Sequence, residues 1–255
     1  MNNLEQFSRD TLKEKDLMLM THVVCGYPSF DDNWKMLELM DKNGADIVEL
    51  QFPFSEPSAD GPLFVKANQA AVASGVTVQD CLAFMKKASE AFSFKILMMG
   101  YLNTAWKMGY DKFTDALVEA GACGFILPDL PVEEAGEVHA MAAKKGLAPI
   151  MLMTPTTPDV RLKKIAKCAE GLIYVVARKG VTGTKTSMND EVGDFLKRCR
   201  AVTDLPLAVG FGVSCKDDTD YLKGKADMAI VGTASLRAWE SGGEVALDDF
   251  LKNLK

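Results

Sequence analysis

Histidines and paired cysteines are scarce in this sequence of 255 residues. It contains two histidines and six cysteines, and no cysteine stands in a Cys-x-x-Cys pair. A structural zinc site usually takes four Cys or His ligands at short, characteristic spacings. We therefore expect no metal site. The cysteines are expected to be free thiols in a reducing compartment, which favours the cytoplasm.

Long apolar segments and basic clusters are also missing. The longest apolar runs have the length of a strand, which is too short to cross a membrane. The first residues, MNNLEQFSRDTLKEKD, are too polar for a signal peptide. The formal net charge is -6 and no basic run interrupts it, which argues against a nucleic-acid partner. An anionic ligand would need a local site of backbone N–H groups or a few cations.

The apolar residues that are present gather in eight short runs, each followed by a helical pattern. The runs are apolar on both sides of the pleat, which is typical of parallel strands covered by helices. Eight such units predict an α/β fold, a (β/α)8 TIM barrel, in one domain over residues 1–255. The alternative is a doubly wound open sheet, whose GxGxxG turn after the first strand is absent here. The runs begin at Leu17, Asp46, Phe94, Gly124, Ala148, Gly171, Pro206 and Asp227.

Two segments depart from an even repeat. Residues 1–15 predict an extra helix that could close the bottom of the barrel. Residues 53–80, between the second and third runs, predict a long loop and an added helix. Long loops in compact domains usually serve function. We therefore expect part of the active site after the second strand.

Glycine-rich turns follow the last three runs. Gly183 follows the sixth run, Gly212 the seventh, and Gly232 with Thr233 the eighth. Glycine allows the backbone to approach an anion closely, and a helix N-terminus favours negative charge. TIM barrels often bind phosphate at the loops after strands seven and eight. The glycines favour a phosphate site, although ordinary turns would also use them.

Two carboxylates stand where a barrel has its active site. Glu49 lies near the end of the second run, and Asp60 lies in the loop that follows. If Phe52, Met99 and Tyr174 surround Glu49, desolvation would raise its pKa, so that it could both give and take protons. Alternatively, Glu49 could pair with a buried Arg or Lys or point outwards. Asp60 could simply serve the turn ADGP.

The stretch VELQFPFSEPSADGP resembles the signature of the tryptophan synthase alpha chain family, which is close to E-L-G-x-P-F-S-D-P-x-A-D-G-P. Further blocks occur in the family's order along nearly the whole chain. They are CGYPS, MMGYLN, FILPDLPVEE, TPTTPDVRLKKIA, GVTGTK, VGFGVS and AIVGTA.

This resemblance implies a TIM barrel and a lyase of tryptophan biosynthesis. The implied reaction is retro-aldol cleavage of indole-3-glycerol phosphate to indole and glyceraldehyde 3-phosphate. Indole then passes through a tunnel to a beta chain, in a heterotetramer of two alpha and two beta chains. The beta chain joins indole to L-serine with pyridoxal phosphate, and the resemblance implies no cofactor in the present chain.

The resemblance also implies residue roles. Glu49 matches the general acid/base, and Asp60 matches the carboxylate that stabilises positive charge near the indole nitrogen. Thr182 matches a lid residue that reaches towards Asp60. The implied substrate-binding residues are His22, Met99, Tyr101, Tyr174, Thr182, Gly183, Phe211, Gly212, Gly232 and Thr233.

Several residues depart from the family pattern near the second strand. Gln51 stands where glycine is usual, Phe52 where a smaller apolar residue is common, and Glu56 where aspartate is usual. Together with Pro57, these residues are expected at the surface that meets the beta chain. The departures keep two alternatives open: a different phosphate-binding barrel isomerase or synthase, and a weakly active partner that only regulates a beta chain.

Overall fold

Eight parallel strands close into a barrel in this computed structural model, which describes residues 2–177, 190–210 and 212–254. Each strand pairs with the next along the chain, and the first pairs with the last. The predicted TIM barrel is therefore confirmed. The strands are β1 (Met18–Val24), β2 (Ile47–Gln51), β3 (Lys95–Met99), β4 (Gly124–Ile126), β5 (Ala148–Met153), β6 (Ile173–Val176), β7 (Leu207–Gly210) and β8 (Met228–Val231).

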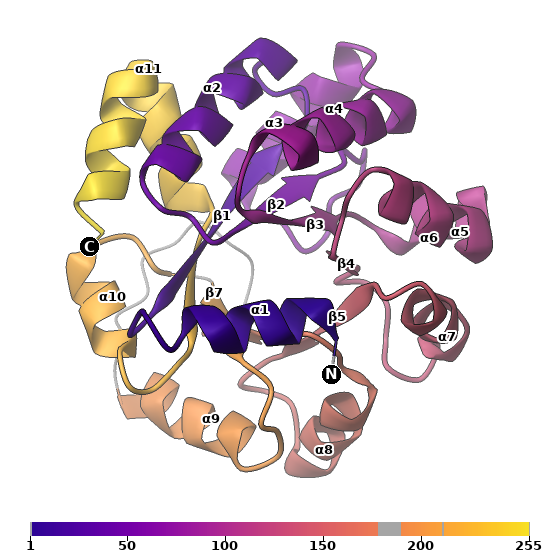
Figure 1. Cartoon of the computed structure of the whole chain (residues 1–255), viewed down its shortest axis with the longest axis vertical. Coiled ribbons are helices and arrows are strands. Elements are labelled where there is room, and N and C mark those ends of the chain that lie inside the picture. Colours follow the sequence, from indigo (N-terminus) through magenta and orange to yellow (C-terminus); the bar gives the residue numbers. More distant parts are fainter. Residues whose placement is uncertain (1, 178–189, 211, 255) are drawn as a thin grey trace.

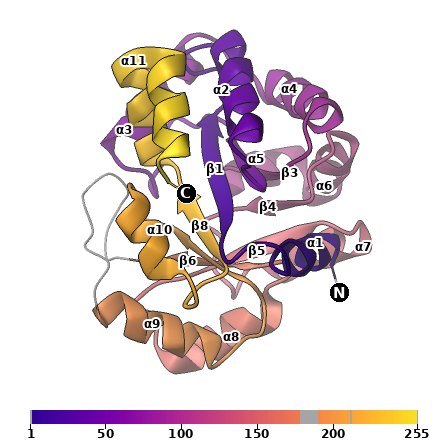
Figure 2. The same cartoon turned by 60° about the vertical axis from the view of Figure 1, so that its left-hand side comes forward.

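Helices surround the barrel, as Figure 1 and Figure 2 show from two sides. Sequence signals for their ends agree with the structure: the Ser29 hydroxyl accepts a bond from the Asp32 N–H at 3.1 Å, and Gly44 follows with φ 72°. In the described residues the helices are α1 (Asn3–Thr11), α2 (Phe30–Lys42), α3 (Pro62–Ala73), α4 (Val78–Ala91), α5 (Leu102–Met108), α6 (Tyr110–Glu119), α7 (Gly136–Lys144), α8 (Asp159–Cys168), α9 (Asp190–Arg200), α10 (Lys216–Leu222) and α11 (Thr233–Lys252).

The two predicted departures from an even repeat are present. Helix α1 crosses the strands (Figure 1), and Leu4 packs into the barrel interior with Met18 and Met20. After β2, a loop leads to the added helix α3 before α4 completes the unit. No helix in the described ranges is long and apolar enough to span a membrane.

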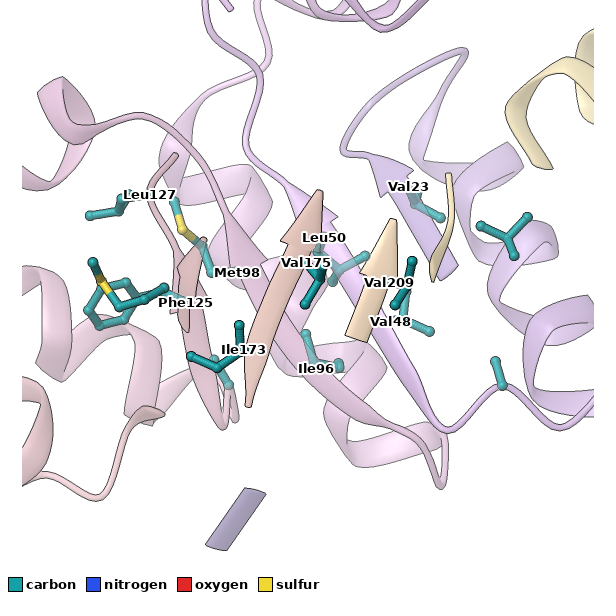
Figure 3. Close-up of a cluster of buried hydrophobic side chains, with 14 of the residues drawn as sticks. Val23, Val48, Leu50, Ile96, Met98, Phe125, Leu127, Ile173, Val175 and Val209 are labelled. Atoms are coloured by element: carbon teal, nitrogen blue, oxygen red, sulfur yellow. The ribbon is translucent and has the colours of Figure 1, made fainter. Parts of the chain in front are cut away.

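The side chains of β2 alternate between two layers, as a strand requires. Val48 and Leu50 point outwards into the layer between barrel and helices (Figure 3). Ile47 joins the cluster inside the barrel, and Glu49 occupies the next inward position. Phe52 belongs to the outer layer, so its predicted place as a wall around Glu49 is wrong. The strand thus delivers Glu49 to the barrel interior near its C-terminal end.

Candidate active site

A cavity of about 280 Å³ lies at the C-terminal ends of the strands. It brings together eight of the predicted site residues, from four strands and from the segments that follow β2, β7 and β8. They are His22, Glu49, Asp60, Met99, Tyr174, Gly212, Gly232 and Thr233. Thr182, Gly183 and Phe211 lie outside the described residues. A site at this end of the barrel agrees with the position that TIM-barrel enzymes use.

Glu49 is 1% exposed and is held by a histidine. Its Oε2 lies 2.8 Å from Nδ1 of His22, the residue beside it in register on β1. Its Oε1 is buried and finds no hydrogen-bond partner in the described part of the chain. The alternative of a buried Lys or Arg partner is therefore wrong. One carboxylate oxygen is anchored, and the other is left for a ligand.

The environment of His22 favours its charged form. Burial by itself lowers the pKa of His22. Four interactions together outweigh burial, so that the pKa is raised: the hydrogen bond to Glu49, the negative charges of Glu49 and Asp60, and the hydrogen bond to Gln51. The His22 ring also packs against Phe64 of α3, with centroids 4.5 Å apart. Glu49 therefore has a titratable imidazole on one side, where sequence reasoning expected only apolar walls.

Asp60 faces into the barrel through two hydrogen bonds to the same oxygen. Its Oδ2 accepts from Gln51 Nε2 at 2.7 Å and from the Tyr101 hydroxyl at 3.0 Å. The Tyr101 oxygen in turn accepts from the Ala59 N–H at 3.1 Å. Burial raises the pKa of Asp60, while His22, Gln51 and Tyr101 oppose that change. Asp60 also serves its turn, since its N–H donates to Pro57, but the turn aims the carboxylate at the cavity.

Tyr174 on β6 faces the cavity as a neutral phenol. Burial raises its pKa well above the ordinary value, and the charges of Glu49 and Asp60 raise it further. A Cβ at Gly210 would lie 2.6 Å from the Tyr174 hydroxyl oxygen. Gly210 therefore leaves the space that the ring needs, and Tyr174 with Met99 offers an apolar wall beside the carboxylates.

Part of the remaining lining comes from the loop after β7 and the start of α11. The loop after β7 contributes Gly212 and Ser214, and the start of α11 contributes Gly232, Thr233 and Arg237. A Cβ at Gly232 would lie 3.3 Å from both His22 and Phe64, so glycine fits best there. Because α11 begins at Thr233, its free N–H groups favour an anion at this end of the cavity.

Comparison with known proteins agrees with this geometry. The family model for the tryptophan synthase alpha chain matches residues 7–253. The chain belongs to the tryptophan synthase alpha chain family. The alpha chain of Syntrophotalea carbinolica is 45% identical over 99% of this chain and 100% of its own, and that of Desulfotalea psychrophila is 43% identical over 99% of both.

Solved structures of the same family share the fold. Mycobacterium tuberculosis tryptophan synthase superposes with a TM-score of 0.92 at 29% identity, covering 99% of this chain and 96% of that one. A chain of the Pyrococcus furiosus tryptophan synthase complex superposes with a TM-score of 0.86 at 29% identity, covering 93% of this chain and 97% of that one. The family's reaction, cleavage of indole-3-glycerol phosphate, is thus the activity of this lyase.

The alpha-chain signature around β2 is placed differently from what the sequence predicted. Gln51 is 0% exposed and Phe52 is 3% exposed, and Pro57 is buried as well. Of the four residues predicted at a partner surface, only Glu56 is exposed in this chain, and their contact with a beta chain stays a prediction. The strand's period of two gives the reason, because Gln51 must point inwards if Glu49 does.

Two further features of this alpha chain escaped the sequence reasoning. Tyr101 does not line the cavity itself, but its hydroxyl bonds two groups that do, the Asp60 carboxylate and the Ala59 N–H. Arg237 lines the cavity although it was not predicted. Its spacing from Thr233 was a usable signal, because residues four apart lie on one face of a helix. No cluster of three metal-binding side chains occurs in the described ranges.

Proposed function

We propose that Glu49 and Asp60 carry out the cleavage of indole-3-glycerol phosphate in this cavity. The observation that supports this proposal most directly is the pair of buried carboxylates in one cavity with the N-terminus of α11. The carboxylates suit the indole and glycerol parts of the substrate, and the helix end suits its phosphate.

Glu49 is the proposed general acid/base. Cleavage of the carbon–carbon bond needs a proton at the ring carbon that bears the side chain, and a base for the neighbouring hydroxyl. Oε1 of Glu49 is free to exchange these protons, since only Oε2 is bonded to His22. Protonation of the ring gives a cation, which the Asp60 carboxylate stabilises near the ring nitrogen.

Apolar side chains and backbone groups complete the proposed substrate site. Met99 and Tyr174 contact the indole, with Phe211 as a predicted third wall outside the described residues. Gly212, Gly232 and Thr233 receive the phosphate, and Gly183 and Thr182 remain predictions for the loop after β6.

We also propose that the chain works with a tryptophan synthase beta chain, as an alpha subunit of an alpha2beta2 complex. The Pyrococcus furiosus protein is described as such a complex with mutual activation. Exposed Glu56 is a candidate contact residue. The cofactor is pyridoxal phosphate in the beta chain, and none is expected here. The free thiols suit the cytoplasm, and one domain over residues 1–255 is the simplest organisation.

Release of indole from indole-3-glycerol phosphate tests this proposal. The isolated chain should release indole slowly, and a cognate beta chain should increase the rate. Glu49→Gln should abolish turnover while the substrate analogue indole-3-propanol phosphate still binds, because the variant keeps the shape of the site and loses the exchangeable proton. Normal turnover in Glu49→Gln would refute the role of Glu49.

The same assay separates the two alternatives. An isomerase or synthase of another reaction would release no indole from indole-3-glycerol phosphate, with or without a beta chain. A chain that only regulates a beta chain would release no indole by itself, although it would raise the beta chain's rate of tryptophan formation from indole and serine.

A further inference from the structure

A continuous row of buried side chains connects the two carboxylates of the site. His22 Nδ1 lies 2.8 Å from Glu49 Oε2, and His22 Nε2 lies 2.8 Å from Gln51 Oε1. Gln51 Nε2 then donates to Asp60 Oδ2 at 2.7 Å. All four side chains are at most 8% exposed. Water therefore has little opportunity to replace these bonds, and the row is built into the barrel interior.

The direction of each hydrogen bond follows from the Gln51 amide. The amide nitrogen only donates, which suits the Asp60 carboxylate, so the amide oxygen must face His22. His22 Nε2 therefore carries a hydrogen. On the other side of the ring, Nδ1 faces Glu49 Oε2, and two lone pairs at 2.8 Å would repel one another. One proton must lie between them, on either Nδ1 or Oε2.

We propose that His22 and Gln51 are positioning residues that hold Glu49 and Asp60 in a fixed relation and place one shared proton on the Oε2 side of Glu49. This inference rests on the proposed function of the two carboxylates. With Oε2 committed to His22, Oε1 is the oxygen that exchanges protons with a ligand. A proton taken up at Oε1 and later released there leaves the shared proton in place, so the pair returns to its starting state.

The polar surroundings of His22 determine how the row responds to pH. Glu49 of β2 and Asp60 of the following loop are the anions facing it, while Tyr174 of β6 and Arg237 of α11 line the same cavity and Tyr101 bonds Asp60. The two carboxylates raise the pKa of His22. The shared proton is therefore lost only as the pH rises through this raised pKa. Activity should fall on the basic side when that happens.

The scarcity of histidine makes the proton directly measurable. The chain has only His22 and His139, so two imidazole titrations are expected by NMR. His139 on α7 lies 3.2 Å from the Cys168 carbonyl oxygen, and burial lowers its pKa. His22 should thus titrate at a higher pH than His139. A His139→Gln variant assigns the signals and should leave activity unchanged.

Removing the carboxylate of Glu49 should shift the NMR titration of His22 but not that of His139. In Glu49→Gln, the pKa of His22 should fall, because burial still disfavours the imidazolium while the opposite charge is gone. The signal of His139 should stay where it is. This measurement needs no turnover, so it tests the row even if the chain fails to cleave indole-3-glycerol phosphate.

Kinetics test what the row does for the reaction. Gln51→Met keeps the length of the side chain and loses both hydrogen bonds. We expect kcat to fall by about 10- to 100-fold, since small displacements of catalytic groups have effects of that size. KM should change by less than about 3-fold, because the substrate contacts remain.

His22→Asn should retain more activity than His22→Phe, because its amide can still donate to Glu49 from the position of Nδ1. Neither His22→Asn nor His22→Phe should show the fall in activity at high pH that is expected of the wild type.

Two results would overturn the inference. One is a His22 titration at or below that of His139 in the folded wild type. The other is a wild-type kcat and pH profile in Gln51→Met. Circular dichroism of each variant identifies misfolding, and for a misfolded variant the NMR titrations of the wild type and Glu49→Gln decide the question. The wild type could release no indole although His22 titrates above His139 and shifts in Glu49→Gln. That result would refute the proposed function and leave the inference about His22 and Gln51 intact.

Discussion

Tyr101 shows at the scale of one residue how a side chain outside the cavity controls a group inside it. Its hydroxyl donates to Asp60 Oδ2 and accepts from the Ala59 N–H, and its ring stacks on Phe54 at 5.1 Å. The bond from Tyr101 favours the ionised form of Asp60 and so opposes the burial that raises the pKa of Asp60. The hydroxyl therefore helps to keep the carboxylate charged when the indole cation forms.

Tyr101→Phe should shift the acid limb of the activity profile to higher pH. Without the hydroxyl the pKa of Asp60 rises further, so protonation inactivates the site at a less acidic pH. The variant should also lose about 1–2 kcal/mol of unfolding free energy, because a half-buried N–H and a buried carboxylate each lose a partner. The pH dependence of kcat/KM and urea unfolding measure the two effects. Tyr110→Phe on α6 is the matched control, and an unchanged acid limb in Tyr101→Phe would contradict the role given to its hydroxyl.

Sequence reasoning found Glu49 and Asp60 and missed what joins them. The two carboxylates stood out because charged groups are unusual next to apolar strands. The contact between His22 and Glu49 depends on the register of β1 and β2, which no pattern within either strand specifies. The position of Gln51 was predictable in principle, since it lies two residues after Glu49 on the same strand. The resemblance to the family instead implied a place for Gln51 at the partner surface, which ignores that alternation.

At the scale of one element, α11 combines a helix N-terminus with a cation. Arg237 lies one turn into the helix and lines the cavity that contains Gly232 and Thr233. Its side chain is exposed and has no ion-pair partner in the described part of the chain. A substrate phosphate bound at the helix end would gain charge neutralisation from it.

Arg237→Gln should therefore weaken substrate binding without slowing the chemical step. We expect KM for indole-3-glycerol phosphate to rise by about 10-fold, which corresponds to about 1.4 kcal/mol, with kcat nearly unchanged. The loss should be largest at low ionic strength, because exposed charges are screened by salt. Lys86→Gln removes the same charge from the exposed face of α4 and should leave KM as it is. Equal KM values in the two variants would show that Arg237 does not contribute to phosphate binding.

At the scale of the whole molecule, the residues for catalysis and the packing of α1, which stabilises the fold, lie at opposite ends of the barrel. The catalytic groups gather at the C-terminal ends of the strands, whereas α1 covers the other end. The alternation of apolar runs and helices was enough to predict this architecture, since eight parallel strands covered by helices have few ways to close. Sequence patterns could not show how deeply α1 enters the barrel, because that depends on side chains from several strands meeting it.

Leu4→Ala tests this division. Leu4 is 1% exposed and belongs to the buried cluster inside the barrel, and a Cβ on Gly171 would meet its Cδ2 at 3.0 Å. Truncation should cost about 2–4 kcal/mol of unfolding free energy through lost burial and a cavity. Urea unfolding followed by circular dichroism measures the loss, and Val245→Ala, at a position that is 72% exposed, should change stability by less than about 0.5 kcal/mol. Because Leu4 lies far from the mouth, kcat below the unfolding range should stay at the wild-type value. A large fall in kcat with unchanged stability would mean that the two ends of the barrel are coupled.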